Sequence, residues 1–70
     1  MKYLVVIERA KRGFSAYSPD LPGCVAAAGT RRRVEKLMRE AVALHVSGLR
    51  AYGERVPSPR SYSTYVAVRA

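Results

Sequence analysis

The sequence predicts an α+β fold of two layers, in which one long helix packs on an antiparallel sheet. Two observations lead to this expectation. Residues 30–52 are the only stretch long enough for a substantial helix, and the remainder consists of short runs with strand composition separated by turns. The expected order is β-β-β-α-β, in a single domain that spans residues 1–70.

Residues 2–9 predict the first strand because they are rich in β-branched and aromatic side chains. Both faces of this strand are apolar, which is typical of a central strand covered on both sides. One helix can cover only one of those faces, so the other requires a second protomer or a partner. The polar residues 10–13 end in glycine and predict a hairpin, and residues 14–18 alternate as a second, antiparallel strand.

A proline-rich turn follows the second strand. It consists of Pro19, Asp20, Leu21, Pro22, Gly23 and Cys24. The two prolines fix their φ angles, Gly23 is free to adopt positive φ, and Asp20 is expected to accept hydrogen bonds from nearby backbone amides. Residues 24–28 then predict a third strand of small side chains, which would let a helix approach closely.

Amphipathic periodicity predicts the helix from Thr30 to Tyr52. Its apolar stripe consists of Val34, Leu37, Met38, Ala41, His45, Gly48, Leu49 and Tyr52. Thr30 is a suitable N-cap, and Gly53 suits the left-handed residue that ends a helix. Residues 53–60 contain two prolines and predict an extended connection, after which the alternating residues 61–70 predict a fourth strand.

The helix begins with cations where capping rules favour acids. Arg31, Arg32 and Arg33 follow Thr30 directly, although a helix N-terminus already carries about half a positive charge. Beside exposed backbone N–H groups these arginines would make an anion site, with Lys11 and Arg12 as further basic residues for phosphates. The alternative is that the arginines are a solvated face.

Charge and length limit the classes of function. A net charge of +8 and a pI of about 10.4 favour a negatively charged partner such as nucleic acid, a membrane surface or an acidic protein. No apolar run is long enough for a membrane span or a signal peptide, and the lone Cys24 suits a reducing compartment, so we expect a cytoplasmic protein. A domain of 70 residues buries little surface, and the sequence shows no disulfide pair or metal-ligand cluster that would stabilise it. We therefore expect a homodimer or higher oligomer.

No constellation of residues predicts catalysis. The acids Glu8, Asp20, Glu35, Glu40 and Glu54 are scattered over the expected elements, so carboxylate or two-metal chemistry has no support. Cys24 and His45 could form a nucleophile–base pair, but a buried cysteine is usually inert and a histidine on an apolar stripe is usually a hydrogen-bonded core residue. We therefore expect no enzyme activity, no cofactor and no metal, and a cryptic hydrolase is the least favoured hypothesis.

Several motifs occur in a characteristic order. The most distinctive is Phe-Ser-Ala-Tyr-Ser-Pro-Asp-Leu-Pro-Gly-Cys-Val at residues 14–25, and the others are Ala-Gly-Thr at 28–30, Arg-Glu-Ala-Val-Ala-Leu-His at 39–45, Gly-Leu at 48–49, Gly-Glu at 53–54 and Val-Pro-Ser-Pro at 56–59. Over nearly the whole chain this order resembles the HicB-like antitoxin family. The resemblance implies a partial ribonuclease-H-like fold that lacks the catalytic carboxylates. It also implies a protein that binds and masks HicA-type toxins, which are small ribonucleases with a double-stranded-RNA-binding-like fold.

The sequence departs from the family pattern in two respects. Family members usually carry a C-terminal helix-turn-helix or ribbon-helix-helix that binds operator DNA, and without one we expect no autorepression by that route. An antitoxin against a basic ribonuclease is expected to be acidic, whereas this chain carries +8 and has arginines where the family tends to have acids. Our first hypothesis is a non-enzymatic antitoxin-type inhibitor of a HicA-like ribonuclease. The alternative is a stand-alone basic module that binds RNA or DNA through phosphates.

Overall fold

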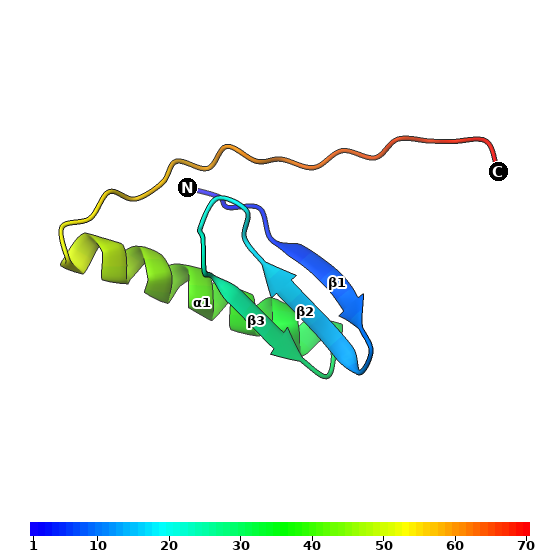
Figure 1. Cartoon of the computed structure of the whole chain (residues 1–70), viewed down its shortest axis with the longest axis horizontal. Helices are drawn as coiled ribbons and strands as arrows, with labels where there is room; N and C mark the ends of the chain where they lie inside the picture. Colours follow the sequence, from blue (N-terminus) through cyan, green and yellow to red (C-terminus); the bar gives the residue numbers. More distant parts are fainter.

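A computed structural model describes all residues from 1 to 70. The elements are β1 (Val6–Ala10), β2 (Gly13–Tyr17), β3 (Val25–Ala28) and α1 (Arg31–Ala51). The three strands form one antiparallel sheet in the order β1-β2-β3, and α1 lies across one face of it (Figure 1). The predicted α+β arrangement of one helix on an antiparallel sheet is therefore confirmed. No helix is both long and apolar enough to span a membrane.

The hairpin between β1 and β2 has a two-residue turn, because Ala10 pairs with Gly13. Gly13 has a φ of +107°, and a Cβ atom at this position would overlap the carbonyl oxygen of Ala28 on β3. Only glycine meets both demands. The hairpin therefore forms where the sequence predicts it, and Gly13 also allows the close approach of β3.

The core lies between the sheet and α1. It consists of Ala16, Leu21, Cys24, Val34 and Met38. The strand register places Ile7, Ala16 and Ala26 in one row on the helix side, and the two alanines let α1 approach the sheet. Only six of the 70 residues are buried, so the interior alone provides limited hydrophobic stabilisation.

Both predicted caps of α1 are present. Thr30 has extended backbone angles, and its Oγ1 accepts a hydrogen bond of 3.1 Å from the backbone N–H of Arg33. At the other end Gly53 has a φ of +68°. The N–H groups of Gly53 and Glu54 donate back to carbonyls of the last helical turn over 3.1 and 2.8 Å, which is a Schellman motif.

The apolar stripe of α1 is buried only where the sheet lies beneath it. Val34 and Met38 are buried, whereas Tyr52 is 85% exposed. His45 is half-buried and lies outside the core, which corrects the expectation of a core histidine. Because α1 has 21 residues and is about 30 Å long, it extends past strands of four or five residues (Figure 1).

The expected fourth strand does not form. Residues 54–70 contain neither strand nor helix, and the last of them extend away from the sheet (Figure 1). A strand needs a neighbouring edge for its backbone hydrogen bonds, and this segment pairs with neither edge of its own sheet. The first strand is also shorter than predicted, and it lies at an edge of the sheet rather than at its centre.

Candidate interaction surfaces

The proline-rich turn anchors the C-terminal part of the chain through Asp20. Its Oδ2 accepts hydrogen bonds of 2.8 Å from the backbone N–H groups of both Arg60 and Ser61, and its Oδ1 accepts one of 3.0 Å from the Ser61 hydroxyl. The N–H of Ser61, followed by that of Arg60, lowers the pKa of the Asp20 carboxyl from its ordinary value of 3.8. Asp20 therefore accepts from backbone amides, as its residue type predicts, but from amides 40 and 41 positions away.

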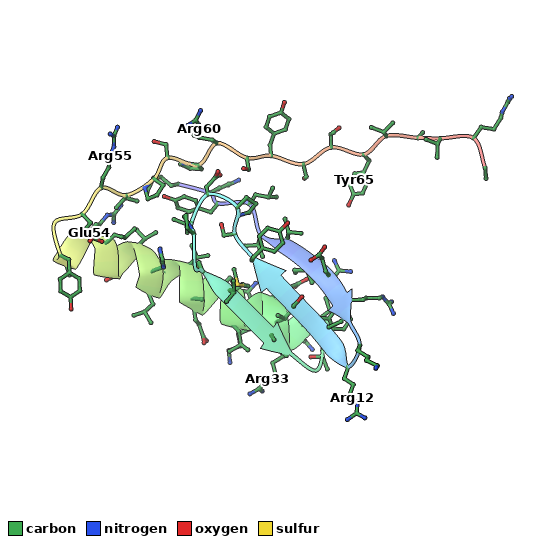
Figure 2. The ribbon with its side chains drawn as sticks, viewed as in Figure 1. Arg12, Arg33, Glu54, Arg55, Arg60 and Tyr65 are labelled. Atoms are coloured by element: carbon green, nitrogen blue, oxygen red, sulfur yellow. The ribbon has the colours of Figure 1, made fainter.

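The connection after α1 is held at a second point. The hydroxyl of Tyr3 donates to the carbonyl oxygen of Pro57, so the connection lies against the residues that precede β1. Between the turn and the connection is a hollow of about 530 Å³, lined by Pro19, Asp20, Pro22, Arg55, Pro57, Ser58 and Arg60. Arg55 and Arg60 project from the connection into solvent (Figure 2).

Two other residues of the turn, Leu21 and Cys24, are buried in the core. Leu21 is fully buried, and the turn is closed by backbone hydrogen bonds from Ser18 N to Cys24 O and from Cys24 N to Leu21 O. Burial raises the pKa of the Cys24 thiol, which disfavours the thiolate needed for nucleophilic attack. Cys24 belongs to the core whereas His45 lies outside it, and no three His, Cys, Asp or Glu side chains gather into a metal site.

A basic cluster covers the first turns of α1. Arg32, Arg33, Lys36 and Arg39 line a shallow hollow of about 350 Å³ together with Thr30. We call these four residues the basic cluster. Arg31 is not among them, and its guanidinium forms a 3.0 Å ion pair with Glu35.

The structure thus divides the five cations that the sequence singled out. Arg32 and Arg33 share the hollow, whereas Lys11 and Arg12 form the exposed turn of the β1–β2 hairpin. Arg12 and Arg33 lie at the same end of the molecule (Figure 2). The sequence reasoning missed Lys36 and Arg39, although the spacing from Arg32 is i, i+4, i+7, which places all three on one helix face.

An apolar groove runs between β1 and α1. It has a volume of about 350 Å³, and Tyr3, Val5, Ile7, Met38 and Val42 form most of its apolar lining. The groove is open because α1 lies mainly over β2 and β3 and touches β1 only at its margin. We call it the β1 groove, and no feature of the sequence alone predicted it.

The outer face of the sheet is the other uncovered apolar surface. Val6, Tyr17 and Val25 stand in one row across the three strands, on the side opposite α1. Tyr17 is 41% exposed and Val25 is 64% exposed. This row, which we call the outer sheet row, is an apolar strip in which Tyr17 and Val25 are exposed and Val6 is half-buried.

Comparisons with known proteins place the fold in a family. Residues 3–69 match the model of the family described as HicB_like antitoxin of bacterial toxin-antitoxin system. The chain belongs to this family. The resemblance found in the sequence motifs is therefore confirmed.

This HicB-like chain is similar to a chain of a solved complex and to a phage protein. A chain in a solved structure named HicA3 and HicB3 toxin-antitoxin complex superimposes with a TM-score of 0.72 at 35% identity, covering 86% of this chain and 70% of that one. An uncharacterized 14.9 kDa protein from the rep-hol intergenic region of Haemophilus phage HP1 is 29% identical over 66 residues. That match covers 94% of this chain and 50% of the phage protein, so the chain spans about half the length of this relative.

Proposed function

We propose that this HicB-like protein is a non-enzymatic antitoxin that binds and neutralises a small ribonuclease of the HicA type. The observation that carries the proposal is the likeness to a chain of the HicA3 and HicB3 complex, at 35% identity over 86% of the chain. Membership of an antitoxin family over residues 3–69 supports the same role. The protein acts by binding, and its lone cysteine is buried in the core rather than presented to a substrate.

The outer sheet row is the surface that we propose for the toxin. Protein interfaces are centred on aromatic and aliphatic anchors that become desolvated on binding, and Tyr17 beside Val25 provides such a centre. The opposite face of the sheet is already occupied by α1. Glu8 follows Val6 by two residues, so β1 presents its carboxylate on the same side as the row, where it suits a basic partner.

The test uses a purified ribonuclease of the HicA type. We expect the two proteins to elute as one complex and RNA cleavage to stop when the antitoxin is in excess. Val25→Arg, on the outer sheet row, should weaken the complex at least about tenfold, since a central anchor is worth about 1.4 kcal/mol or more. The matched control is Leu44→Arg, at a position that is 75% exposed on α1, and it should bind normally.

Two results would count against this proposal. Unimpaired RNA cleavage with no complex would reject the antitoxin function. A complex that survives Val25→Arg but is lost with Leu44→Arg would keep the function and move the toxin surface to the exposed side of α1.

The basic cluster favours a second function, contact with nucleic acid phosphates. Its hollow is lined by four cations and Thr30, with no acidic side chain among them. Binding through such a surface is electrostatic and weakly dependent on sequence, so retardation of RNA should fall steeply between about 50 and 200 mM salt. Lys36→Glu should weaken it, whereas the same charge change at Lys2, outside the cluster, should have less effect. An absence of retardation at low salt would reject this function.

A further inference from the structure

The C-terminal segment has the composition of a strand but no partner in the chain. We call residues 62–69 the C-terminal arm. Tyr62, Tyr65, Val66 and Val68 are 86, 100, 79 and 85% exposed, so apolar side chains on both faces of the arm contact almost nothing. Figure 2 shows Tyr65 in open solvent. A row of exposed β-branched and aromatic residues of this kind marks an interaction site.

The point from which the arm departs is fixed. The hydrogen bonds of Asp20 to residues 60 and 61, and that of Tyr3 to Pro57, hold the preceding connection against the proline-rich turn and the residues before β1. Beyond Ser61 the arm runs outwards and diverges from β1 (Figure 1). It contributes to a long axis of 49 Å in a chain whose other axes are 27 and 15 Å. The arm is therefore presented away from its own sheet.

The same chain has an open sheet edge to which a further strand can be added. β1 is an edge strand, so the backbone N–H and C=O groups on its outer side have no ladder partner. The β1 groove opens along this edge, with Val5 and Ile7 on one wall and Val42 on the other. A strand added to β1 would place every second side chain in this groove.

We propose that the C-terminal arm of one protomer adds to β1 of a second copy of this chain, and that the exchange is reciprocal. Each copy has one C-terminal arm and one open β1 edge, so in a two-fold dimer each arm pairs with the β1 edge of the other copy. The assembly is then closed, and neither β1 edge remains unpaired. The exchange makes β1 an internal strand, as its two apolar faces require. It also leaves the outer sheet row free, so the dimer and the proposed toxin surface are independent.

Proline substitutions in the arm test the backbone ladder. Tyr65→Pro and Val66→Pro each remove one N–H, and because consecutive N–H groups of a strand point to opposite sides, one of the two variants must lose a pairing bond. Light scattering should show a dimer for the unaltered chain and dissociation at least about tenfold easier for one variant. The control is Ser58→Pro, an exposed position between two prolines, which should remain dimeric. Helical circular dichroism verifies that all variants remain folded.

An equal mixture of ¹³C-labelled and unlabelled chains tests whose arm occupies the groove. Filtered NOE spectra should show contacts from the methyl groups of Val66 or Val68 to Ile7, and these contacts should run between labelled and unlabelled chains. A monomer at all concentrations, a dimer unaffected by both arm prolines, or contacts confined to one chain would each overturn the proposal.

Discussion

Replacing Arg33 with glutamate should stabilise the fold, because half of a capping box is already in place. Thr30 Oγ1 accepts from the Arg33 N–H at 3.1 Å, and the box is complete when a carboxylate at position 33 accepts from the N–H of Thr30 in return. The first turn of α1 contains no acidic residue. The one ion pair nearby joins Arg31 to Glu35, so Arg33 gives up no acidic partner within the chain.

The expected gain follows from two contributions. Completing a cap is worth about 0.3–1.5 kcal/mol, and removing a cation from the positive end of the helix dipole adds about 0.3–1 kcal/mol at an exposed site. Because the two are not fully additive, we expect a total of about 0.5–1.5 kcal/mol. For a domain of this size about 1 kcal/mol corresponds to 4–8 °C, so the Tm should rise by about 2–12 °C.

Thermal unfolding followed by circular dichroism measures the effect, at one protein concentration because self-association would shift the Tm. Arg32→Glu is the matched control: it makes the same charge change one position earlier, where the side chain cannot complete the box. Its gain should be smaller and should shrink in about 1 M salt, which screens the dipole contribution. The gain of Arg33→Glu should persist in part.

A Tm for Arg33→Glu that is no higher than that for Arg32→Glu would refute the capping argument. A Tm below that of the unaltered protein would mean that Arg33 already has an acidic or carbonyl partner in another subunit. RNA retardation on the same variant adds a separate result. If the basic cluster binds phosphates, binding should weaken while the Tm rises.

Three further predictions concern the rest of the fold. Met38→Ala should lower the free energy of unfolding by about 2–5 kcal/mol in urea titrations, because Met38 is 1% exposed in the core. Gly13→Ala should cost about 1–3 kcal/mol through its positive φ, whereas Gly29→Ala, with no atom near its Cβ position, should be nearly neutral. The pKa of Asp20 is lowered in the folded chain, so its carboxylate stabilises the fold above the ordinary value of 3.8 and this contribution is lost as the pH falls through the lowered pKa. The protection of the Ser61 amide from exchange, measured relative to its intrinsic rate at each pH, should therefore fall on acidification, and Asp20→Asn should remove that dependence.

The parts of the fold that local chemistry determines were predictable from the sequence. Thr30 and Gly53 cap α1 as expected, because a side-chain oxygen before a helix and a residue with free φ after it act within a few positions of themselves. The hairpin at Gly13 depends likewise on a single turn. The family resemblance was predictable for a different reason, since its motifs recur in order over residues 3–69.

Features that join distant parts of the chain were not predictable. Asp20 has the residue type of a turn-forming acceptor, but its partners lie 40 and 41 residues away. The basic cluster was half predicted, since Arg32 and Arg33 were named and Lys36 and Arg39 were not. The β1 groove depends on where a 21-residue helix crosses the sheet, which no periodicity specifies.

The two errors about strands have one physical cause. The sequence of residues 2–9 indicates a strand buried on both faces, and that of residues 61–70 indicates a strand with apolar side chains on both faces. Periodicity reports what a strand must bury but not which strand lies beside it, because side-chain alternation is the same whether the neighbour belongs to the same chain or to another. In this chain β1 lies at an edge and the C-terminal arm is unpaired. β1 has the composition of a central strand but lies at an edge, and the C-terminal arm has the composition of a strand but has no neighbour. In the proposed dimer the arm of one copy pairs with β1 of the other, so that both segments obtain the neighbour that their composition requires.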